Sequence, residues 1–261
     1  MISALFILFW FGFTLLMSLY VNMAIWMIAL WFILGFIVSF FAVVIFLVLN
    51  FPILKWTKVT HPYKYYLSRS TSHWLIVFFM RLKIKVTGKE HVPKDGILTV
   101  YANHKSYADP FIIFEVMERP TTFTPKMGVY KLPLISQWLK YLGAFPIDRS
   151  SDRNTAKAMV EAIKVVKQGM AMTIFPEGGI KDRDDEKMVA MRAGAYRLAV
   201  KAHADLLPIS IKGTSEIKRR APFRSTTIQV TIHPVIPFET IKDMKTADIA
   251  EMMFEIINRN I

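Results

Sequence analysis

A histidine and an aspartate five residues apart are the residue pair best suited to chemistry in this sequence. They lie in the block YANHKSYADP (residues 101–110), between an apolar run and a helical pattern. Histidine acts as a general base near neutral pH, and it needs a partner that fixes its tautomer and stabilises the imidazolium. Asp109 can serve His104 in this way, so the pair indicates proton abstraction from a substrate.

The same block also allows a purely structural interpretation. Asp109 before Pro110 is typical of a helix start with proline in the first turn, and Ser106 is another residue type that caps helices. Five residues correspond to about 500° on an ideal helix, so the two side chains would not share a helix face. The chemical hypothesis therefore requires His104 in a loop and Asp109 at the start of a helix.

Two further blocks place polar residues at the ends of apolar segments. Residues 174–180 read IFPEGGI, where two glycines would let backbone N–H groups approach an anion or an oxyanion. Residues 143–149 read GAFPIDR, where Arg149 could bind phosphate oxygens through two parallel hydrogen bonds. Each block has an ordinary alternative, a glycine turn in the first and an exposed Asp148–Arg149 pair in the second.

Together, NHKSYAD, GAFPIDR and FPEGG resemble, in this order, the N-H-x-x-x-x-D, G-x-F-x-x-D/R-R and F-P-E-G blocks of the glycerolipid acyltransferase family, over roughly residues 84–215. The resemblance implies transfer of a fatty acyl group from acyl-CoA or acyl-carrier-protein to the free hydroxyl of a lysophospholipid. The expected reaction converts lysophosphatidic acid to phosphatidic acid in phospholipid biosynthesis. No covalent acyl-enzyme, cofactor or metal ion is expected.

The resemblance also implies roles for individual residues. His104 would be the general base, Asp109 would orient its ring, and Arg149 would hold the acceptor phosphate. The expected substrate-binding residues are Asn103, Ser106, Lys126, Arg149, Glu177, Gly178 and Gly179. The family pattern continues F-P-E-G-T-R, whereas this chain has Gly179 and Ile180 at the last two positions. The missing hydroxyl and guanidinium leave the acceptor open between lysophosphatidic acid, another lysophospholipid and glycerol 3-phosphate.

Other function classes fit the sequence less well. A membrane esterase or phospholipase would need a nucleophile, but there is no G-x-S-x-G elbow, and Ser106 is too close to His104 in the sequence for a standard triad nucleophile. A non-enzymatic anchor that binds lipid or nucleic acid would use the basic charge, but no aromatic and basic motif for nucleic acid is present. The acidic run at 182–186 lacks the EF-hand glycine, so a solvated loop is expected there instead of a cation site.

The elements that must position these blocks follow from the hydrophobic pattern. From residue 83 onward, short β-rich runs alternate with helical stretches, which predicts an α/β fold with a mostly parallel sheet flanked by helices. The expected strands are 83–87, 97–102, 121–125, 144–147, 170–175, 206–212 and 226–233. The expected helices are 110–118, 130–142, 152–168, 189–203 and 239–258.

The first 54 residues contain no Lys, Arg, Asp or Glu. A helix crosses the roughly 30 Å hydrocarbon core in about 20 residues, so two spans are expected, near 3–20 and 25–49. One long span with an interfacial helix is the alternative, and a cleaved signal peptide is disfavoured by the length and the missing basic start. Lys55, Lys58 and the basic residues after them predict a catalytic domain on the cytoplasmic side of the cell membrane.

The sequence thus predicts three regions. Residues 1–54 form a transmembrane hairpin, 55–82 a basic and interfacial connecting segment, and 83–261 the catalytic domain. The net charge of +13 favours anionic membrane lipid as a partner, and the absence of cysteine excludes thiol nucleophiles, thiolate metal sites and disulfides. Lys212, Lys218, Arg219 and Arg220 form a basic patch suited to lipid headgroups or an acidic carrier protein, with a solvated surface as the alternative.

Overall fold

The computed structural model of the chain describes residues 1–21, 25–146, 152–180 and 185–261. The chain divides into two compact units, Met1–Thr57 and Lys58–Ile261. Each unit is described below by itself.

The first unit is a pair of long apolar helices, α1 (Ile2–Tyr20) and α2 (Trp26–Leu49), followed by the short α3 (Phe51–Trp56). Both expected spans are therefore helical, and both are long and apolar enough to cross a membrane. Trp10 Nε1 donates to the Phe32 carbonyl at 2.7 Å across the pair. A Cβ at Gly35 would lie 2.9 Å from Thr14 Oγ1, so glycine there allows the close helix contact.

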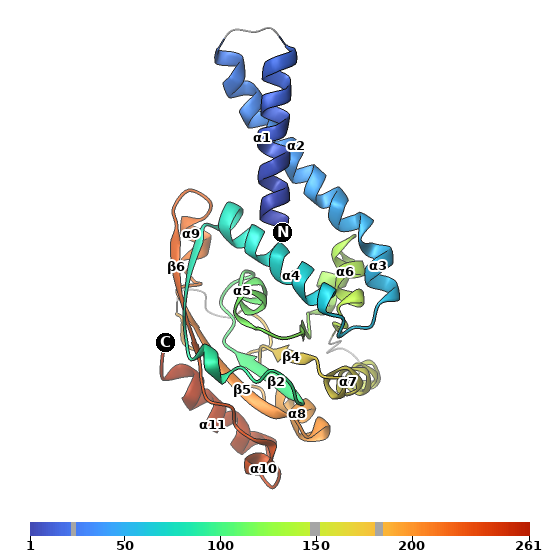
Figure 1. Cartoon of the computed structure of the whole chain (residues 1–261). Helices are drawn as coiled ribbons and strands as arrows, with labels where there is room; N and C mark the ends of the chain where they lie inside the picture. Colours follow the sequence, from blue (N-terminus) through green and yellow to red (C-terminus); the bar gives the residue numbers. More distant parts are fainter. Residues whose placement is uncertain (22–24, 147–151, 181–184) are drawn as a thin grey trace. The chain divides into compact units, whose positions relative to one another are not determined.

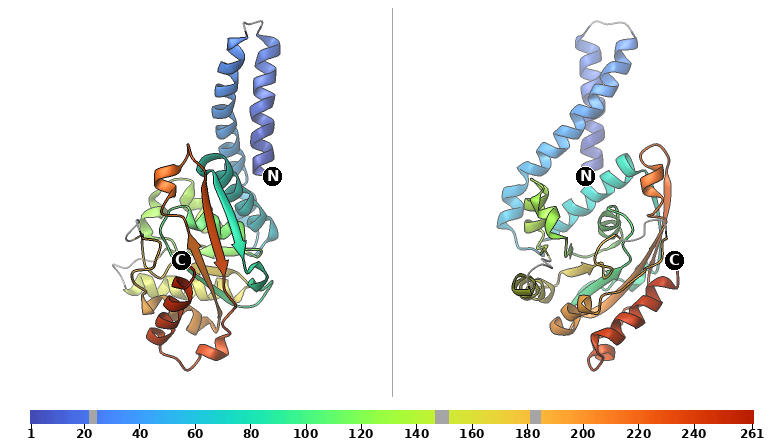
Figure 2. Two further views of the ribbon diagram at one scale, coloured as in Figure 1. Left: turned by 90° about the vertical axis from the view of Figure 1, so that its left-hand side faces the viewer. Right: turned by 180° about the vertical axis from the view of Figure 1, so that it is seen from behind.

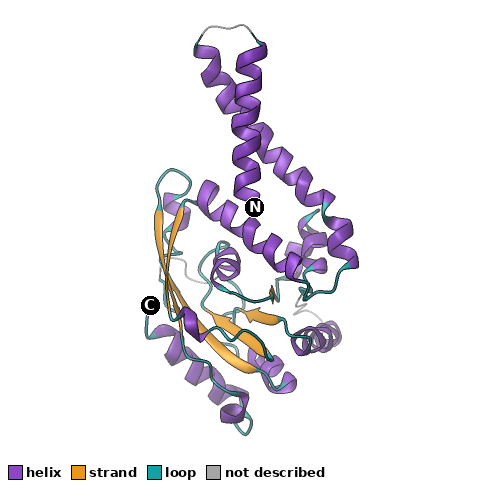
Figure 3. Ribbon diagram, viewed as in Figure 1, coloured by secondary structure: helices purple, strands orange, loops and turns teal. Residues whose placement is uncertain are grey.

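The second unit is built on a sheet whose strands are orange in Figure 3. The sheet has six strands in the order β1-β6-β5-β2-β4-β3. All neighbouring strands are parallel except β5 and β6, which confirms the predicted mostly parallel sheet. The strands are β1 (Leu82–Thr87), β2 (Leu98–Ala102), β3 (Thr121–Phe123), β4 (Ala171–Ile174), β5 (Asp205–Lys212) and β6 (Thr226–Ile232).

Helices cover both faces of this sheet, as Figure 2 shows. On one face, Val100 and its neighbours pack against the π-helix η1 (Leu75–Met80) and α5 (Asp109–Val116), with α4 (Pro62–Trp74) against α5. On the other face, Tyr101 belongs to a second core that includes residues of α7, α8, α10 and α11. These helices are α7 (Asp152–Lys167), α8 (Arg197–Ala202), α10 (Phe238–Ile241) and α11 (Thr246–Asn258). Burial on both faces explains why β2 is a continuous apolar run.

One expected strand is wrong over its described part, because Ala144, Phe145 and Pro146 form a loop. The helix before it, α6 (Ile135–Tyr141), ends in a Schellman turn in which Gly143 adopts φ +70°. The Gly143 N–H bonds to the Lys140 carbonyl, and the Ala144 N–H bonds to the Leu139 carbonyl. Local helix-end hydrogen bonds thus take the backbone groups that a strand would have needed.

Three expected helices are shorter or divided. Proline at position 133 separates the 3₁₀ turn η3 (Met127–Lys131) from α6. The helix expected at 189–203 begins only with the 3₁₀ turn η4 (Ala193–Tyr196), which leads into α8. The stretch expected at 239–258 consists of α10 and α11, and the apolar run 72–80 is helical as the end of α4 and η1.

Candidate active site

The loops that follow β2, β4 and β3 meet along the side of the sheet where these three strands end. These strands are parallel neighbours, and their register pairs Tyr101 with Ile174 and Phe123 with Thr173, so their carboxyl ends lie side by side. Binding sites of open α/β sheets form outside such ends. The NHKSYAD block after β2 and the FPEGG block after β4 are therefore adjacent in space, at what we call the carboxyl edge (Figure 1).

His104 lies in the loop after β2, and Asp109 is the first residue of α5, the arrangement that their sequence spacing requires. His104 Nδ1 is 2.8 Å from Asp109 Oδ2. Because an ionised carboxylate only accepts hydrogen bonds, we assign the proton to Nδ1, which leaves the Nε2 lone pair for another group. The His104 side chain is 15% exposed and that of Asp109 is fully buried, so only the imidazole is accessible.

Asp109 also fixes the loop that carries the histidine. Its Oδ2 accepts the backbone N–H groups of Lys105 at 2.8 Å and Ser106 at 2.9 Å, beside the N-terminus of α5 where negative charge is favourable. The His104 ring stacks on Phe175, with centroids 4.2 Å apart and planes inclined by 19°. The structural and the chemical interpretation of the aspartate are thus compatible, because one oxygen holds both the loop and the imidazole.

A buried ion pair supports the same loop. Glu177 Oε1 accepts the backbone N–H of His104 at 2.8 Å, and its Oε2 lies 3.2 Å from Lys105 Nζ. Both side chains are fully buried. Burial raises the pKa of the Glu177 carboxyl, while the His104 N–H and Lys105 oppose that rise. The carboxylate expected to bind substrate instead holds the backbone of the histidine.

Lys105 is a residue that the sequence reasoning missed. It stands inside the NHKSYAD block, next to the histidine, where a lysine would ordinarily be assigned to the surface. That position was the only indication of its role in the sequence, because its partner Glu177 is 72 residues away. The contact becomes visible only once β2 and β4 are neighbours.

Asn103 and Ser106 were also expected to bind substrate. Asn103 is buried, and its amide exchanges two hydrogen bonds with the backbone of Ile211, at 2.7 and 2.8 Å, which ties β2 to β5. These bonds make Asn103 a support of the sheet, and its expected role in binding substrate stays a prediction. Ser106 Oγ accepts the N–H of Ala108 at 3.2 Å, and its own hydroxyl hydrogen remains available to another acceptor.

The glycines after Glu177 shape a turn. Gly178 has φ +78° and Gly179 has φ +154°, backbone conformations that favour glycine. The Gly178 N–H donates to the Phe175 carbonyl at 3.1 Å and so closes the turn. A Cβ at Gly179 would meet no heavy atom within 4 Å, so the space beside that residue is open.

Two basic residues, Lys126 and Arg149, are expected near the acceptor phosphate, and the structure describes only Lys126. Lys126 follows β3 and is exposed, at the carboxyl edge that also carries His104. Arg149 lies outside the described residues. The position of Lys126 agrees with a site that spans the ends of β2, β4 and β3.

Glu186 belongs to the acidic run that was expected to be a solvated loop. That expectation is wrong for Glu186, which is partly buried and hydrogen-bonded. Its Oε1 accepts the backbone N–H groups of Gly213 at 2.9 Å and Ser215 at 3.1 Å, and also the Ser215 hydroxyl. These contacts fasten the segment after β4 to the segment after β5. Among the residues described, no group of three or more His, Asp or Glu side chains could hold a metal ion.

Comparisons with known proteins agree with this arrangement. The family model described as Acyltransferase matches residues 83–212. The 1-acyl-sn-glycerol-3-phosphate acyltransferase of Borreliella burgdorferi is 26% identical over 182 residues, which cover 69% of this chain and 72% of that protein. The protein of the same name from Limnanthes douglasii is 27% identical over 190 residues, which cover 72% of this chain and 66% of that protein.

A solved structure supports the fold as well. The crystal structure of the 1-acyl-sn-glycerophosphate (LPA) acyltransferase PlsC from Thermotoga maritima superposes with a TM-score of 0.61 over 99% of this chain and 92% of that chain, at 21% identity. The matched family region contains β2 to β5, all of β1 except Leu82, and every described residue of the His104 loop and the Glu177 turn. The chain belongs to the glycerolipid acyltransferase family.

Proposed function

We propose that the protein transfers a fatty acyl group from an acyl thioester, acyl-CoA or acyl-carrier-protein, to the sn-2 hydroxyl of lysophosphatidic acid. The product would be phosphatidic acid, made for phospholipid biosynthesis. The observation that carries this proposal is the 2.8 Å contact between His104 Nδ1 and Asp109 Oδ2, which leaves the Nε2 lone pair of a partly exposed ring for the acceptor hydroxyl. The curated relatives, which are named for this acyl transfer, support the choice of reaction.

In this mechanism, His104 Nε2 takes the proton of the acceptor hydroxyl as the oxygen attacks the thioester carbonyl. The resulting tetrahedral intermediate collapses with cleavage of the carbon–sulfur bond, and the imidazolium returns the proton to the thiolate. Asp109 holds Nδ1–H throughout and stabilises the positive ring. General base catalysis of this kind contributes about 10²–10⁴-fold, and the fixed loop supplies orientation.

The acceptor phosphate would bind on the β3 and β4 side of the histidine. Lys126 is exposed there, and the family resemblance assigns Arg149 to the same phosphate. Charge-assisted hydrogen bonds of this type contribute about 1.5–3 kcal/mol each. Because Gly179 and Ile180 replace the family's threonine and arginine, another lysophospholipid or glycerol 3-phosphate is the second candidate acceptor.

We place the protein in the cell membrane through α1 and α2, with the second unit on the cytoplasmic side. The support is the apolar character of both helices and the basic residues that follow them, beginning with Lys55 and Lys58. A lysophospholipid acceptor resides in the bilayer, so an anchored enzyme would meet it there. The net charge of +13 would attract anionic lipid to the same surface.

The test uses the full chain purified in detergent, with acyl-CoA or acyl-carrier-protein as donor. The acceptors are lysophosphatidic acid, lysophosphatidylcholine and glycerol 3-phosphate, and products are identified by mass. We expect phosphatidic acid from lysophosphatidic acid, and loss of this product in His104→Ala. His73→Ala is the matched control, because it removes a surface histidine that pairs with Glu115 at 3.1 Å. Full activity of His104→Ala would refute the mechanism.

A further inference from the structure

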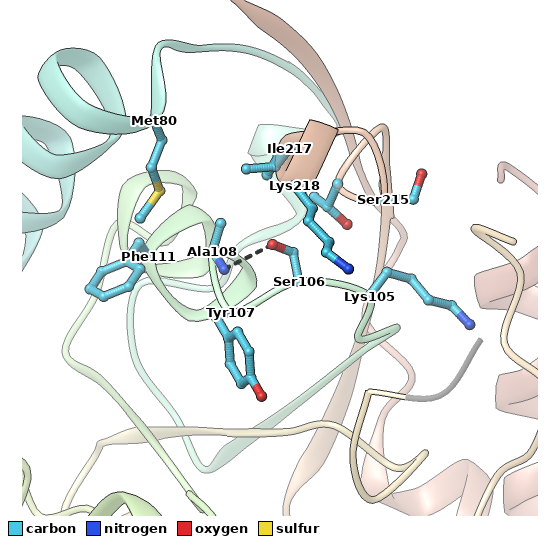
Figure 4. Close-up of a pocket in the computed structure, with 10 residues that line it drawn as sticks. Met80, Lys105, Ser106, Tyr107, Ala108, Phe111, Ser215, Ile217 and Lys218 are labelled. Atoms are coloured by element: carbon cyan, nitrogen blue, oxygen red, sulfur yellow. Dashed lines mark hydrogen bonds between the residues drawn. The ribbon is translucent and has the colours of Figure 1, made fainter. Parts of the chain in front are cut away.

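A cavity of about 300 Å³ lies beside the histidine loop, on the β5 side of β2. One wall is the loop between β2 and α5, and the other is the segment after β5 that leads into α9 (Ile217–Arg220). Figure 4 shows the Lys218 side chain extending toward Ser106 between these walls. The lining residues are Met80, Lys105, Ser106, Tyr107, Ala108, Phe111, Thr214, Ser215, Ile217 and Lys218.

The polar groups of this cavity are suited to an anion. Among the described residues, Lys218 forms no ion pair or hydrogen bond, and it is exposed and lines the cavity. Thr214 is 1% exposed, and its Oγ1 has no hydrogen-bond partner in the described part of the chain. The Ser106 hydroxyl can also donate. A buried hydroxyl without a partner is costly in a protein interior, and a bound ligand would satisfy it.

Apolar side chains form another part of the lining, and hydrogen bonds hold one wall in place. Met80, Phe111 and Ile217 present hydrocarbon to the same space. The segment that carries Thr214 is held in place by Glu186, which binds Gly213 and Ser215 on either side of it. An apolar pocket with a few convergent polar groups is the usual form of a site for a small amphipathic ligand.

The position of the cavity indicates which substrate it takes. β5 and β4 are the two neighbours of β2, so His104 stands between the residues after β5 and those after β4. Lys126 and the glycine turn occupy the β3 and β4 side, where the acceptor is expected. The two substrates must reach the histidine together, so the β5 side is left for the acyl donor.

We infer that this cavity binds the phosphopantetheine arm of the acyl donor, with Lys218 and the Thr214 hydroxyl on the phosphate end. Both acyl-CoA and acyl-carrier-protein carry this arm. Next to its phosphate stands a carbon with two methyl groups, which matches the surface of Met80, Phe111 and Ile217. The inference rests on the proposed function and adds the donor subsite to it.

The test compares two donors that differ only in this phosphate, palmitoyl-4′-phosphopantetheine and palmitoyl-pantetheine, at saturating lysophosphatidic acid. We expect the unaltered protein to prefer the phosphorylated donor by about tenfold or more in kcat/KM, as a charge-assisted hydrogen bond implies. Lys218→Met should abolish the preference, Lys218→Arg should retain part of it, and Thr214→Val should lower it less. Lys201→Met, which removes an exposed lysine of α8 away from the cavity, should keep it.

An equal preference for the phosphorylated donor in the unaltered protein and in Lys218→Met would overturn the inference. So would a Lys218→Met variant whose only kinetic change is a higher KM for lysophosphatidic acid. A calorimetric arm separates this outcome from failure of the proposed function. It measures binding of a non-transferable thioether analogue of palmitoyl-CoA to the full chain and to Lys218→Met. Weaker binding by the variant supports the subsite even if lysophosphatidic acid is not the acceptor, and unchanged binding contradicts it.

Discussion

The two ends of the parallel strands bury charged side chains in different ways. At the carboxyl edge, Lys105 and Glu177 pair with each other, and Asp109 pairs with the partly exposed His104. At the opposite end, which we call the amino edge, Arg119 is 2% exposed and donates only to backbone carbonyls. Its acceptors are Pro93 O at 3.2 Å, Asp95 O at 2.6 Å, Gly96 O at 2.7 Å and Gly169 O at 2.9 Å.

This difference separates stability from chemistry. Carbonyl oxygens do not titrate and cannot turn toward a substrate, so the guanidinium at the amino edge can only hold loops together. The carboxylates at the carboxyl edge hold a partly exposed imidazole and use only one of its two nitrogens. Variants at the carboxyl edge should therefore change activity, and variants at the amino edge should change stability alone.

The largest expected effect is on catalysis, from Asp109→Asn. The amide can donate to Nδ1 and so favour the tautomer of His104 that has no lone pair on Nε2. We expect kcat to fall by about 10²–10⁴-fold with the KM for both substrates nearly unchanged. Steady-state kinetics measure the change, and thermal unfolding verifies the fold. A loss of less than fivefold in a folded variant would show that the aspartate only caps α5.

The second effect concerns the buried pair. Lys105→Met leaves the Glu177 carboxylate buried without its cation, which should lower the free energy of unfolding by about 3–5 kcal/mol. The double variant Lys105→Met with Glu177→Leu should recover much of that stability. Because the Glu177 bond to the His104 N–H is lost, the double variant should stay less active. Urea unfolding in detergent, followed by activity assays, tests both parts, and a fully active double variant would contradict the positioning role.

How much of the site could be predicted from the sequence depends on whether the residues in contact are close together in the sequence. His104 and Asp109 lie in one loop and one helix turn, so residue type and spacing allowed their contact, and the family resemblance selected it over the purely structural interpretation. Lys105 and Glu177 meet only through strand order, which the sequence does not state. The wrong strand at 144–146 arose because the β-forming Phe145 and Ile147 alternate after Gly143, whereas the helix-ending turn at that glycine decides the backbone of the described part.

The amino edge gives the third prediction. Arg119→Met removes four hydrogen bonds to carbonyls and should lower the free energy of unfolding by about 2–4 kcal/mol. Since no substrate-facing group is touched, kcat of the folded variant should remain within twofold. Arg119→Lys should recover only part of the stability, because one ammonium cannot reproduce the planar fork. A large fall in kcat with unchanged stability would remove the distinction between the two edges.

The smallest expected effect is on the pH dependence of stability and comes from His233, which lies outside the histidine loop. His233 follows β6, and its Nε2 lies 2.8 Å from the buried Ser210 hydroxyl. Burial lowers its pKa, with Arg259 and His91 adding to the shift. The unfolded chain therefore binds a proton more readily, so this contribution to stability is complete above about pH 6.5 and is lost as the pH falls toward the native pKa.

Replacing this residue tests that sign. Between pH 8 and pH 5, His233→Gln should lose less unfolding free energy than the unaltered protein, while its kcat at pH 8 stays the same. Urea unfolding at the two pH values measures the difference. An equal loss in both proteins would show that other groups carry the acid sensitivity.

The Arg119 contacts also have a consequence for folding kinetics. Their acceptors are spread from Pro93 to Gly169, in segments that precede β2 and β4, while Arg119 itself precedes β3. All four bonds can form only after these three strands have come together, which places them late on the folding path. Loss of the guanidinium should then accelerate unfolding and leave the refolding rate almost unchanged. The Arg119 hydrogen bonds would thus lengthen the lifetime of the folded enzyme without changing how fast it folds.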